Sequence, residues 1–123
     1  MLEKDLTKIE VKIMKIIWDS ERKLHLKEIT EQVNECFGST WHPQTISTYL
    51  MYLIKKGYLS MERHGRVFLY TAEITEQEFL KKKMEDLFAY HSEYRLIDFL
   101  QMYPKEAFTN EVIKKMKNML QEN

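Results

Sequence analysis

The sequence predicts a mainly helical protein that carries one small β-hairpin near its middle. Apolar residues recur at helical spacing in six separate segments, and two β-prone runs flank a glycine-containing turn. Gly and Pro are scarce, with three and two residues in 123, which leaves little room for long loops. Hydrophobic residues make up 44% of the chain, which is enough for a packed core.

The first helix is predicted to begin at Thr7. Thr7 and Glu10 form a T-x-x-E capping box just before an apolar run. Isoleucines then recur at helical spacing until Trp18 closes the run. Polar residues 19–23 interrupt this pattern, and residues 24–26 read Leu-His-Leu, which is typical of a short strand or an extended segment.

Two further helices are separated by a short turn. The second is predicted over Leu26–Phe37, with Gly38 as its C-terminal cap. The third is predicted over Pro43–Lys56, because proline favours the first helical position and Gly57 stops the helix. Its apolar face consists of Ile46, Leu50, Leu53 and Ile54. Its opposite face holds no carboxylate and carries Gln44, Ser47, Thr48, Met51 and Lys55, flanked by Thr45 and Tyr52.

The predicted hairpin joins residues 58–63 to residues 66–71. His64 and Gly65 lie between these β-prone runs and are predicted to form a two-residue turn. After Ala72 the chain is again helical. Three amphipathic helices are predicted there, from Thr75 to about Tyr90, over about 93–102, and from Thr109 to Leu120.

Charge is balanced overall but unevenly distributed. Lys and Arg number 19, as do Asp and Glu, which argues mildly against a nucleic-acid partner. Yet no Asp or Glu occurs in the 26 residues from Cys36 to Met61, which include Lys55 and Lys56. Arg63 follows shortly. Such a window is what a phosphate-facing surface requires, and the alternative is chance clustering.

The predicted order of helix, helix, turn, helix and hairpin is that of a winged helix-turn-helix domain. An α-helix fits the major groove of B-DNA, and the third helix suits this role because its outer face and its N-terminal end lack acids. We therefore predict double-stranded DNA as the partner. The alternative is a helix whose polar face is merely solvated. The predicted DNA-binding residues are Pro43, Gln44, Thr45, Ser47, Thr48, Tyr52, Lys55, Arg63, His64 and Arg66.

The segment Trp41–Leu59, which reads WHPQTISTYLMYLIKKGYL, resembles the recognition-helix segment of the penicillinase and methicillin-resistance repressors (the BlaI/MecI type). Seven of its residues match the family pattern P-x-T-I/V-x-T-x-x-x-R-L-x-x-K-G: Pro43, Thr45, Ile46, Thr48, Leu53, Lys56 and Gly57. Residues 9–18 are similar to the family's first helix. In close relatives basic residues stand at the positions of Ser47 and Tyr52, so we expect operator preference and affinity to differ here.

The resemblance implies a homodimer on a dyad operator. Residues 1–72 would form the winged-helix DNA-binding domain and residues 73–123 a three-helix dimerisation domain. The residues themselves agree, because three amphipathic helices in about fifty residues are marginal alone. The alternative for the apolar residues of these helices is an intramolecular core. The predicted interface residues are Phe79, Leu87, Phe88, Leu96, Ile97, Phe99, Leu100, Ile113, Met116 and Leu120.

The resemblance also implies how repression would be relieved. The family is cleaved at an Asn-Phe bond, through a membrane sensor-protease pathway that would act on this chain indirectly. The best local match is Asp98-Phe99, where Asp replaces Asn. The alternative is an ordinary helix with Phe99 in the core. A copper-responsive branch of the family carries closely spaced cysteines, whereas this chain has only Cys36.

Other chemistries find little support in the sequence. The four histidines lack metal-ligand spacing, and no catalytic or phosphate-cradling motif occurs, so we predict neither an enzyme nor a cofactor or metal. Cys36 is predicted to be a small buried hydrophobe, and its being the only cysteine excludes an internal disulfide. No apolar run suits a membrane span, and residues 1–7 do not form a signal peptide, so a cytoplasmic protein is expected.

The sequence therefore predicts a dimeric, sequence-specific transcriptional repressor of β-lactam-resistance or other cell-envelope genes. Two rival functions stay open: a winged-helix module that binds protein and not DNA, and a regulator of an unrelated operon such as one for metal resistance. A ligand-binding sensor or enzyme would need a polar pocket.

Overall fold

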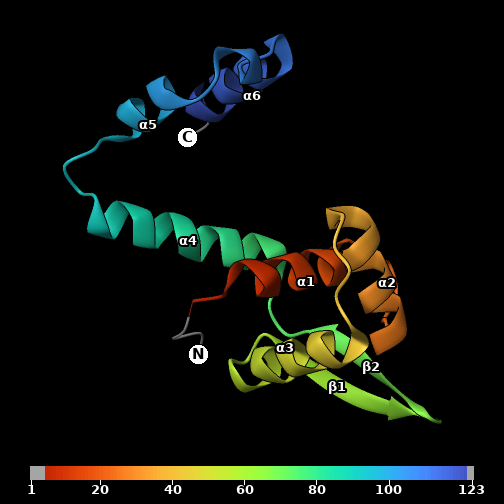
Figure 1. The fold of residues 1–123 in the computed structure, drawn as a ribbon. Helices are drawn as coiled ribbons and strands as arrows, with labels where there is room; N and C mark the ends of the chain where they lie inside the picture. Colours follow the sequence, from red (N-terminus) through yellow and green to blue (C-terminus); the bar gives the residue numbers. More distant parts are fainter. Residues whose placement is uncertain (1–4, 122–123) are drawn as a thin grey trace. The chain divides into compact units, whose positions relative to one another are not determined.

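The computed structural model describes residues 5–121 (Figure 1). The chain forms two compact units, Met1–Lys82 (unit 1) and Lys83–Asn123 (unit 2). Unit 1 contains three helices, a two-stranded sheet and the start of a fourth helix, whereas unit 2 is helical in its described part. This order confirms the predicted class, a mainly helical chain with one β-hairpin.

Helix α1 spans Lys8–Asp19 and begins as predicted. The Thr7 hydroxyl accepts a hydrogen bond from the Glu10 backbone N–H at 3.3 Å, and the Glu10 carboxylate accepts one from the Thr7 N–H at 2.8 Å. These bonds satisfy two donors that a helix start would otherwise leave unpaired. Near the other end, the Trp18 indole N–H donates to the Ile74 carbonyl at 2.8 Å, which ties α1 to the chain that follows the sheet.

Helices α2 (Leu26–Phe37) and α3 (Pro43–Lys55) form the helix-turn-helix. Gly38 ends α2 with a φ of 64°, a left-handed conformation that glycine adopts without steric cost. Pro43 occupies the first turn of α3, as its sequence position predicts. Three side chains of α3, Ile46, Leu50 and Leu53, are fully buried, and they fix which face of the helix turns outward.

Strands β1 (Leu59–His64) and β2 (Val67–Ala72) pair in antiparallel register, and we call this hairpin the wing. The turn lies one residue later than predicted: His64 pairs with Val67, so Gly65 and Arg66 make the turn, not His64 and Gly65. The cause is Gly65, whose φ of 64° suits the first central position of a tight hairpin turn.

Leu24, two residues before α2, extends the sheet. The Tyr70 N–H donates to the Leu24 carbonyl at 2.9 Å, and the two residues form an isolated antiparallel bridge. This confirms the predicted extended segment at Leu24 and His25, whereas Leu26 already begins α2. Leu24 thereby becomes 1% exposed and joins the core.

The core of unit 1 is contributed by all of its elements. Phe79, from the start of α4 (Glu76–Tyr90), packs on Trp18 and Tyr58 with ring centroids 5.3 and 6.2 Å apart. Unit 1 therefore extends past the hairpin into α4. The buried hydrophobic residues are Ile13, Met14, Ile16, Ile17, Leu24, Ile29, Val33, Ile46, Leu50, Leu53, Tyr58, Leu59, Tyr70 and Phe79.

Unit 2 contains the rest of α4, α5 (Leu96–Met102), the 3₁₀ turn η1 (Lys105–Ala107) and α6 (Asn110–Gln121). Helix α5 begins three residues later than predicted, where the Asp98 carboxylate accepts a hydrogen bond from the Arg95 N–H at 2.7 Å. Among residues 83–121, none is fully buried. Apolar side chains of this unit are instead exposed by 37–84%: Met84, Leu87, Tyr90, Tyr94, Leu96, Ile97, Met102, Tyr103, Val112, Ile113, Met119 and Leu120.

One side chain near the end of α2 does not lie where the sequence predicted it. Cys36 is exposed, so the prediction of a buried cysteine was wrong. The last turn of α2 extends past the core, and the neighbouring Phe37 is also 39% exposed.

Over residues 5–121, no helix has the length and apolarity that a membrane crossing requires.

Candidate nucleic-acid interface

The outward face of α3 is exposed and free of acidic side chains. Gln44, Thr48, Met51, Tyr52 and Lys55 are exposed on it. Thr45 and Ser47, at the margins of this face, are half-buried. The anchoring residues on the opposite side of the helix are fully buried, so this face cannot turn toward the core without unfolding the domain. We call these seven residues the α3 face.

The N-terminus of α3 is open to an anion. Pro43 is at its first turn, which holds no acidic residue, and His42 makes no side-chain capping bond. The backbone dipole concentrates partial positive charge at such a helix start. An anionic group, such as a DNA phosphate, is therefore favoured beside Pro43 and Gln44.

The turn that presents this helix start is held by Asn34, a residue the sequence analysis missed. Its side-chain oxygen accepts hydrogen bonds from the Ser39 hydroxyl and the Trp41 N–H, both at 2.8 Å. Its side-chain N–H donates to the Trp41 carbonyl at 3.0 Å. One amide thus fixes the path from α2 to α3. The one sequence signal that could have indicated this role is the position of Asn34, four residues before Gly38.

An aromatic row lies beside the α3 face. The Tyr49 ring meets Trp41 on one side and Tyr52 on the other, with ring centroids 6.3 and 6.0 Å apart and near-perpendicular planes. Tyr52 is 46% exposed. The row therefore holds the Tyr52 side chain at the edge of the face, where its hydroxyl can donate to a phosphate but supplies no charge.

Of the two neighbouring lysines at the end of α3, only Lys55 belongs to the exposed face. The Lys56 ammonium donates to the Glu10 carboxylate at 2.7 Å and to the Asp5 carbonyl at 3.1 Å. The Glu10 side chain is 1% exposed. Burial alone would raise the pKa of Glu10, but its hydrogen bonds from Lys56 and Thr7 together lower that pKa. Lys56 is therefore an internal partner of Glu10.

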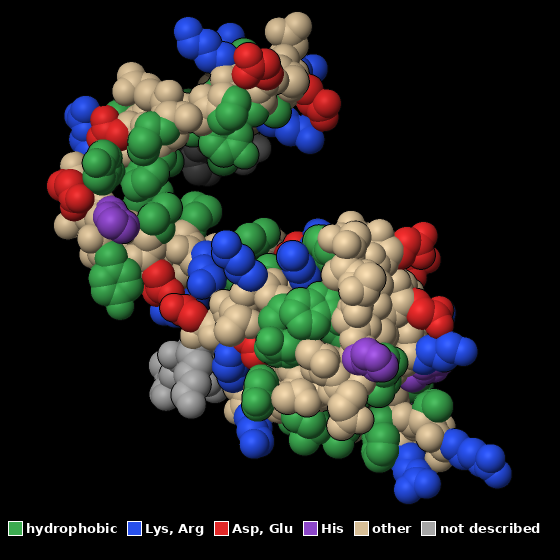
Figure 2. Space-filling view, viewed as in Figure 1, with side chains coloured by type: hydrophobic (Ala, Val, Ile, Leu, Met, Phe, Trp, Pro, Cys, Tyr) green, Lys and Arg blue, Asp and Glu red, His purple; other side chains and the backbone are tan. Residues whose placement is uncertain are grey.

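The tip of the wing is cationic. Arg63, His64 and Arg66 are all exposed, and Figure 2 shows Lys and Arg side chains gathered at this end of the hairpin. The Arg63 guanidinium donates to the Gly65 carbonyl at 3.1 Å, which folds it across the turn. His64 lies 2.5 Å from the Glu62 carboxylate. The acid-free stretch seen in the sequence ended at Met61 and so did not include Glu62. The predicted cationic tip therefore contains one acidic side chain.

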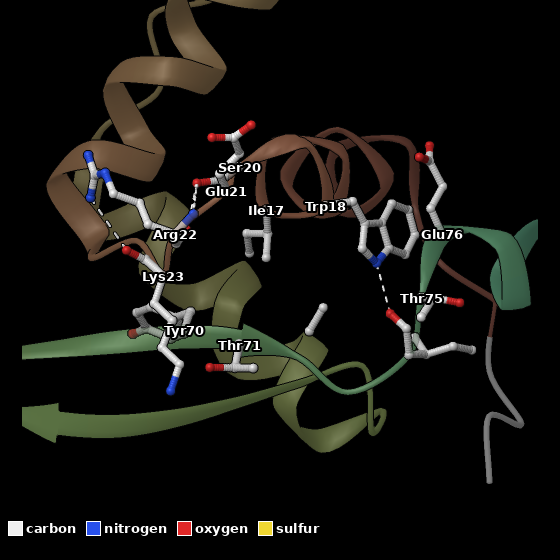
Figure 3. Close-up of a pocket in the computed structure, with 12 residues that line it drawn as sticks. Ile17, Trp18, Ser20, Glu21, Arg22, Lys23, Tyr70, Thr71, Thr75 and Glu76 are labelled. Carbon is white, nitrogen blue, oxygen red and sulfur yellow. Dashed lines mark hydrogen bonds between the residues drawn. The ribbon is translucent and has the colours of Figure 1, made fainter.

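One open hollow of about 490 Å³ lies elsewhere on unit 1, between the end of α1, residues 20–23 and the end of β2 (Figure 3). Charges of both signs line it, including Arg22, Lys23 and Glu76. None of its lining residues belongs to the predicted DNA-binding set. No buried side-chain polar atom among the described residues lacks a partner, and no three potential metal ligands cluster there.

The predicted dimer residues divide by exposure. Phe79 is 7% exposed in the core of unit 1, so it offers a partner the least surface. The other nine are half-buried or exposed on α4, α5 and α6. Asp98 and Phe99 lie in the first turns of α5, where the Phe99 ring contacts Phe88 and Tyr94 at 5.0 and 5.7 Å. The candidate cleavage bond is therefore within a helix and beside an aromatic cluster.

Comparisons with known proteins agree with this geometry. Residues 6–122 match the family model described as penicillinase repressor. Over 74 residues the chain is 39% identical to the penicillinase repressor of Bacillus licheniformis, which covers 60% of this chain but only 56% of that protein. It is 23% identical over 118 residues to the methicillin resistance regulatory protein MecI of Staphylococcus aureus (strain N315), covering 94% and 93% of the two chains.

Solved structures resemble the first part of the chain. The DNA-binding domain of the repressor BlaI matches with a TM-score of 0.53 and 38% identity, over 60% of this chain and 87% of that one. The monomeric form of Bacillus licheniformis BlaI, solved in complex with the blaP half-operator, matches with a TM-score of 0.50 and 37% identity, over 61% and 88%.

Proposed function

We propose that this chain, which belongs to the penicillinase repressor family of winged-helix DNA-binding regulators, represses transcription as a homodimer bound to a dyad operator. The observation that carries the proposal is the exposed, acid-free α3 face in one domain with a cationic wing tip. This arrangement offers side chains to a groove and cations to the adjoining phosphates. The family consists of repressors, and we assign the chain no enzymatic role.

Base recognition is assigned to the start and middle of the α3 face. Gln44 can pair bidentately with adenine, and Thr45 and Ser47 can bond to bases or phosphates. The Thr48 hydroxyl already donates to the Gln44 carbonyl at 3.1 Å, so toward DNA it acts as an acceptor, for example from adenine or cytosine amino groups. This gives α3 a partly fixed hydrogen-bonding pattern before DNA arrives.

Phosphate contacts are assigned to the helix start at Pro43, to Tyr52 and Lys55, and to the wing residues. Arg63, His64 and Arg66 are exposed at the wing tip and extend the cationic surface beyond α3. Such contacts set the register and most of the affinity without reading sequence. Because Ser47 and Tyr52 are uncharged, we expect a smaller salt dependence than in a relative with basic residues there.

Dimerisation is assigned to residues 73–123. The support is the absence of fully buried residues among 83–121, together with the exposed apolar side chains of α4, α5 and α6. A partner copy would cover these faces and place two half-sites about 34 Å apart. Joining two half-sites raises avidity by about 10²–10⁴, so loss of the dimer would relieve repression. The candidate bond for relief by proteolysis is Asp98-Phe99.

We infer the class of regulated genes from the names of the relatives. The matched proteins bear the names penicillinase repressor and methicillin resistance regulatory protein, which favours a β-lactam-resistance or cell-envelope operon. A membrane sensor-protease pathway would then signal to a repressor that works on DNA in the cytoplasm. The rival targets, an unrelated operon or a protein partner, are outcomes of the following experiment.

The test is recovery of genomic fragments bound by the full chain, followed by titration of the recovered site and a scrambled duplex. We expect a dyad site beside resistance or cell-wall genes, bound more tightly than the scrambled duplex. Gln44→Ala should reduce the difference by roughly 1–3 kcal/mol per lost base contact. Thr71→Ala, an uncharged change at the hollow, is the matched control. Equal binding of both duplexes by the wild-type chain would refute sequence-specific repression.

A further inference from the structure

The two faces of the wing differ in composition. Directly paired residues share a face of an antiparallel hairpin, so Arg63 and Phe68 lie together, as do Met61 and Tyr70. Tyr70 is 6% exposed because this side of the sheet packs against the core. We call the side chains of Leu59, Met61, Arg63, Phe68, Tyr70 and Ala72 the inner face of the wing.

Beyond the core, the inner face continues as an uncovered apolar strip. Phe68 is 43% exposed and Met61 is 41% exposed. Met61 lies before the cationic tip in the chain and Phe68 lies after it, and in Figure 2 hydrophobic side chains lie along the hairpin close to the Lys and Arg side chains at its end. Arg63, opposite Phe68, is the only charged residue of this face. An aromatic residue and an arginine therefore occupy paired positions on one face of the hairpin, and none of the six residues of this face is acidic.

The outer face has a different character. It carries the Glu62–His64 pair, and Val67, opposite His64, is 40% exposed. Apolar side chains are thus exposed to a similar extent on both faces. Only the inner face combines them with a cation that has no acidic residue on the same face. The inner face is also the side of the sheet whose Leu59 and Tyr70 join the core of unit 1, to which α3 contributes as well.

We infer that Phe68, with Met61, packs against deoxyribose rings of the DNA strand whose phosphates pair with Arg63. This inference rests on the proposed function and adds an apolar component to it. A DNA backbone alternates anionic phosphates with largely apolar sugar faces, which is the pairing that Arg63 and Phe68 offer. Continuity with the acid-free α3 face and the cations at the wing tip favour DNA over a second copy of the chain.

The contact has a distinct thermodynamic signature. Phosphate neutralisation releases counterions, so its contribution falls as salt rises, whereas burial of apolar surface releases none. Burying about half of the exposed Phe68 surface corresponds to about a five- to tenfold change in affinity. Phe68→Ala should therefore weaken DNA binding by about that factor at every salt concentration and leave the salt slope unchanged.

The experiment titrates full-length protein with a synthetic duplex that the wild-type chain selects from a random-sequence pool, at several salt concentrations. Phe68→Ala is compared with Val67→Ala, a change of similar exposure on the outer face, and with Phe68→Leu, which keeps an apolar side chain. We expect the loss for Phe68→Ala only, with Phe68→Leu close to wild type. Circular dichroism checks that each variant retains its thermal transition. Equal affinities for Phe68→Ala and Val67→Ala would overturn the inference.

A second arm locates the contact. Shortening the duplex at the end beside the wing should weaken the wild type more than Phe68→Ala, because both proteins lose the phosphates that pair with Arg63 but only the wild type also loses the sugar that Phe68 covers. If shortening weakens the wild type and Phe68→Ala equally, Phe68 does not contact that strand and the inference fails. A change in sedimentation of Phe68→Ala without DNA would overturn it in favour of a second copy. If the wild type selects no duplex at all, the proposed function itself fails.

Discussion

The two units differ in how fully their apolar side chains are covered. Unit 1 buries side chains from three helices, the wing and α4 in one core, and five of them are isoleucines or leucines with 0% exposure. Unit 2 also has helices that carry apolar side chains, and α6 is as amphipathic as the helices of unit 1, yet no residue among 83–121 is fully buried. Similar amphipathic patterns therefore give a self-sufficient core in one unit and an unfilled surface in the other. The proposed dimer would account for this difference, because a partner copy would cover the exposed apolar side chains of unit 2.

The largest effect on this difference is expected from shortening the chain at two different positions. A fragment ending at Lys82 keeps Phe79 between Trp18 and Tyr58 and should fold as a stable monomer that binds the operator weakly. A fragment ending at Ala72 loses this ring and should be less stable by about 4 kcal/mol. Chemical denaturation and sedimentation measure both effects. Equal stability of the two fragments, or a dimer formed by the longer one, would contradict the account.

A pair of leucine substitutions sharpens the comparison within the full chain. Leu53 is fully buried in unit 1, whereas Leu96 in unit 2 is 61% exposed. Leu53→Ala should lower the free energy of unfolding of unit 1 by about 3 kcal/mol through the cavity it leaves. Leu96→Ala should change that free energy little but weaken the dimer. Thermal denaturation measures the loss of stability, and sedimentation equilibrium measures the loss of dimer. A destabilised unit 1 in Leu96→Ala, or a weakened dimer with an unchanged stability in Leu53→Ala, would contradict this division between the units.

A smaller effect is expected from pH. His25 caps α2 and pairs with Glu28, and the Arg22 guanidinium, which donates a hydrogen bond to Glu28, lowers the pKa of that carboxyl to about 2. A lowered folded-state pKa contributes stability that is complete above the unfolded pKa of about 4.5 and disappears as pH falls toward 2. Because Arg22 is 64% exposed, we expect only about 1 kcal/mol. Denaturation of Glu28→Gln should show a flatter acid limb, and an unchanged limb would exclude this pair as its cause.

The smallest predicted effect concerns one phosphate contact. Lys55→Ala should weaken binding to all duplexes alike and reduce the magnitude of the salt slope by about one unit. Lys56→Ala is the informative neighbour, because Lys56 pairs with Glu10 and its loss should lower the stability of unit 1 without changing that slope. Titration at several salt concentrations measures the slope. The same slope change for both lysines would contradict the distinction between them.

The elements predicted from the sequence are those specified by local signals. The capping boxes at Thr7 and Thr75 both form, and α2 has the predicted bounds because its apolar stripe and Gly38 both lie within the segment. The hairpin turn shifted by one residue because a single glycine was consistent with two turn positions. The strand runs alone did not decide between Gly65 as the first and as the second central residue.

The features that the sequence did not indicate depend on contacts between distant residues. The Lys56–Glu10 pair joins residues 46 positions apart, so the neighbouring lysines looked equivalent in the sequence. Asn34 acts through the backbone of Trp41, which requires the turn to be formed first. Cys36 was expected to be buried because of its residue type, but exposure depends on how far α2 extends beyond the core.

The central claim is that duplex DNA binds along the α3 face and the wing tip. Chemical-shift mapping of the full chain with a selected duplex tests this most directly, because each residue reports its own environment. We expect shifts at Gln44, Ser47, Lys55 and Arg66, and none at Lys23 or Thr71, which line the hollow on unit 1. Shifts concentrated at the hollow, with the α3 face unchanged, would contradict the claim.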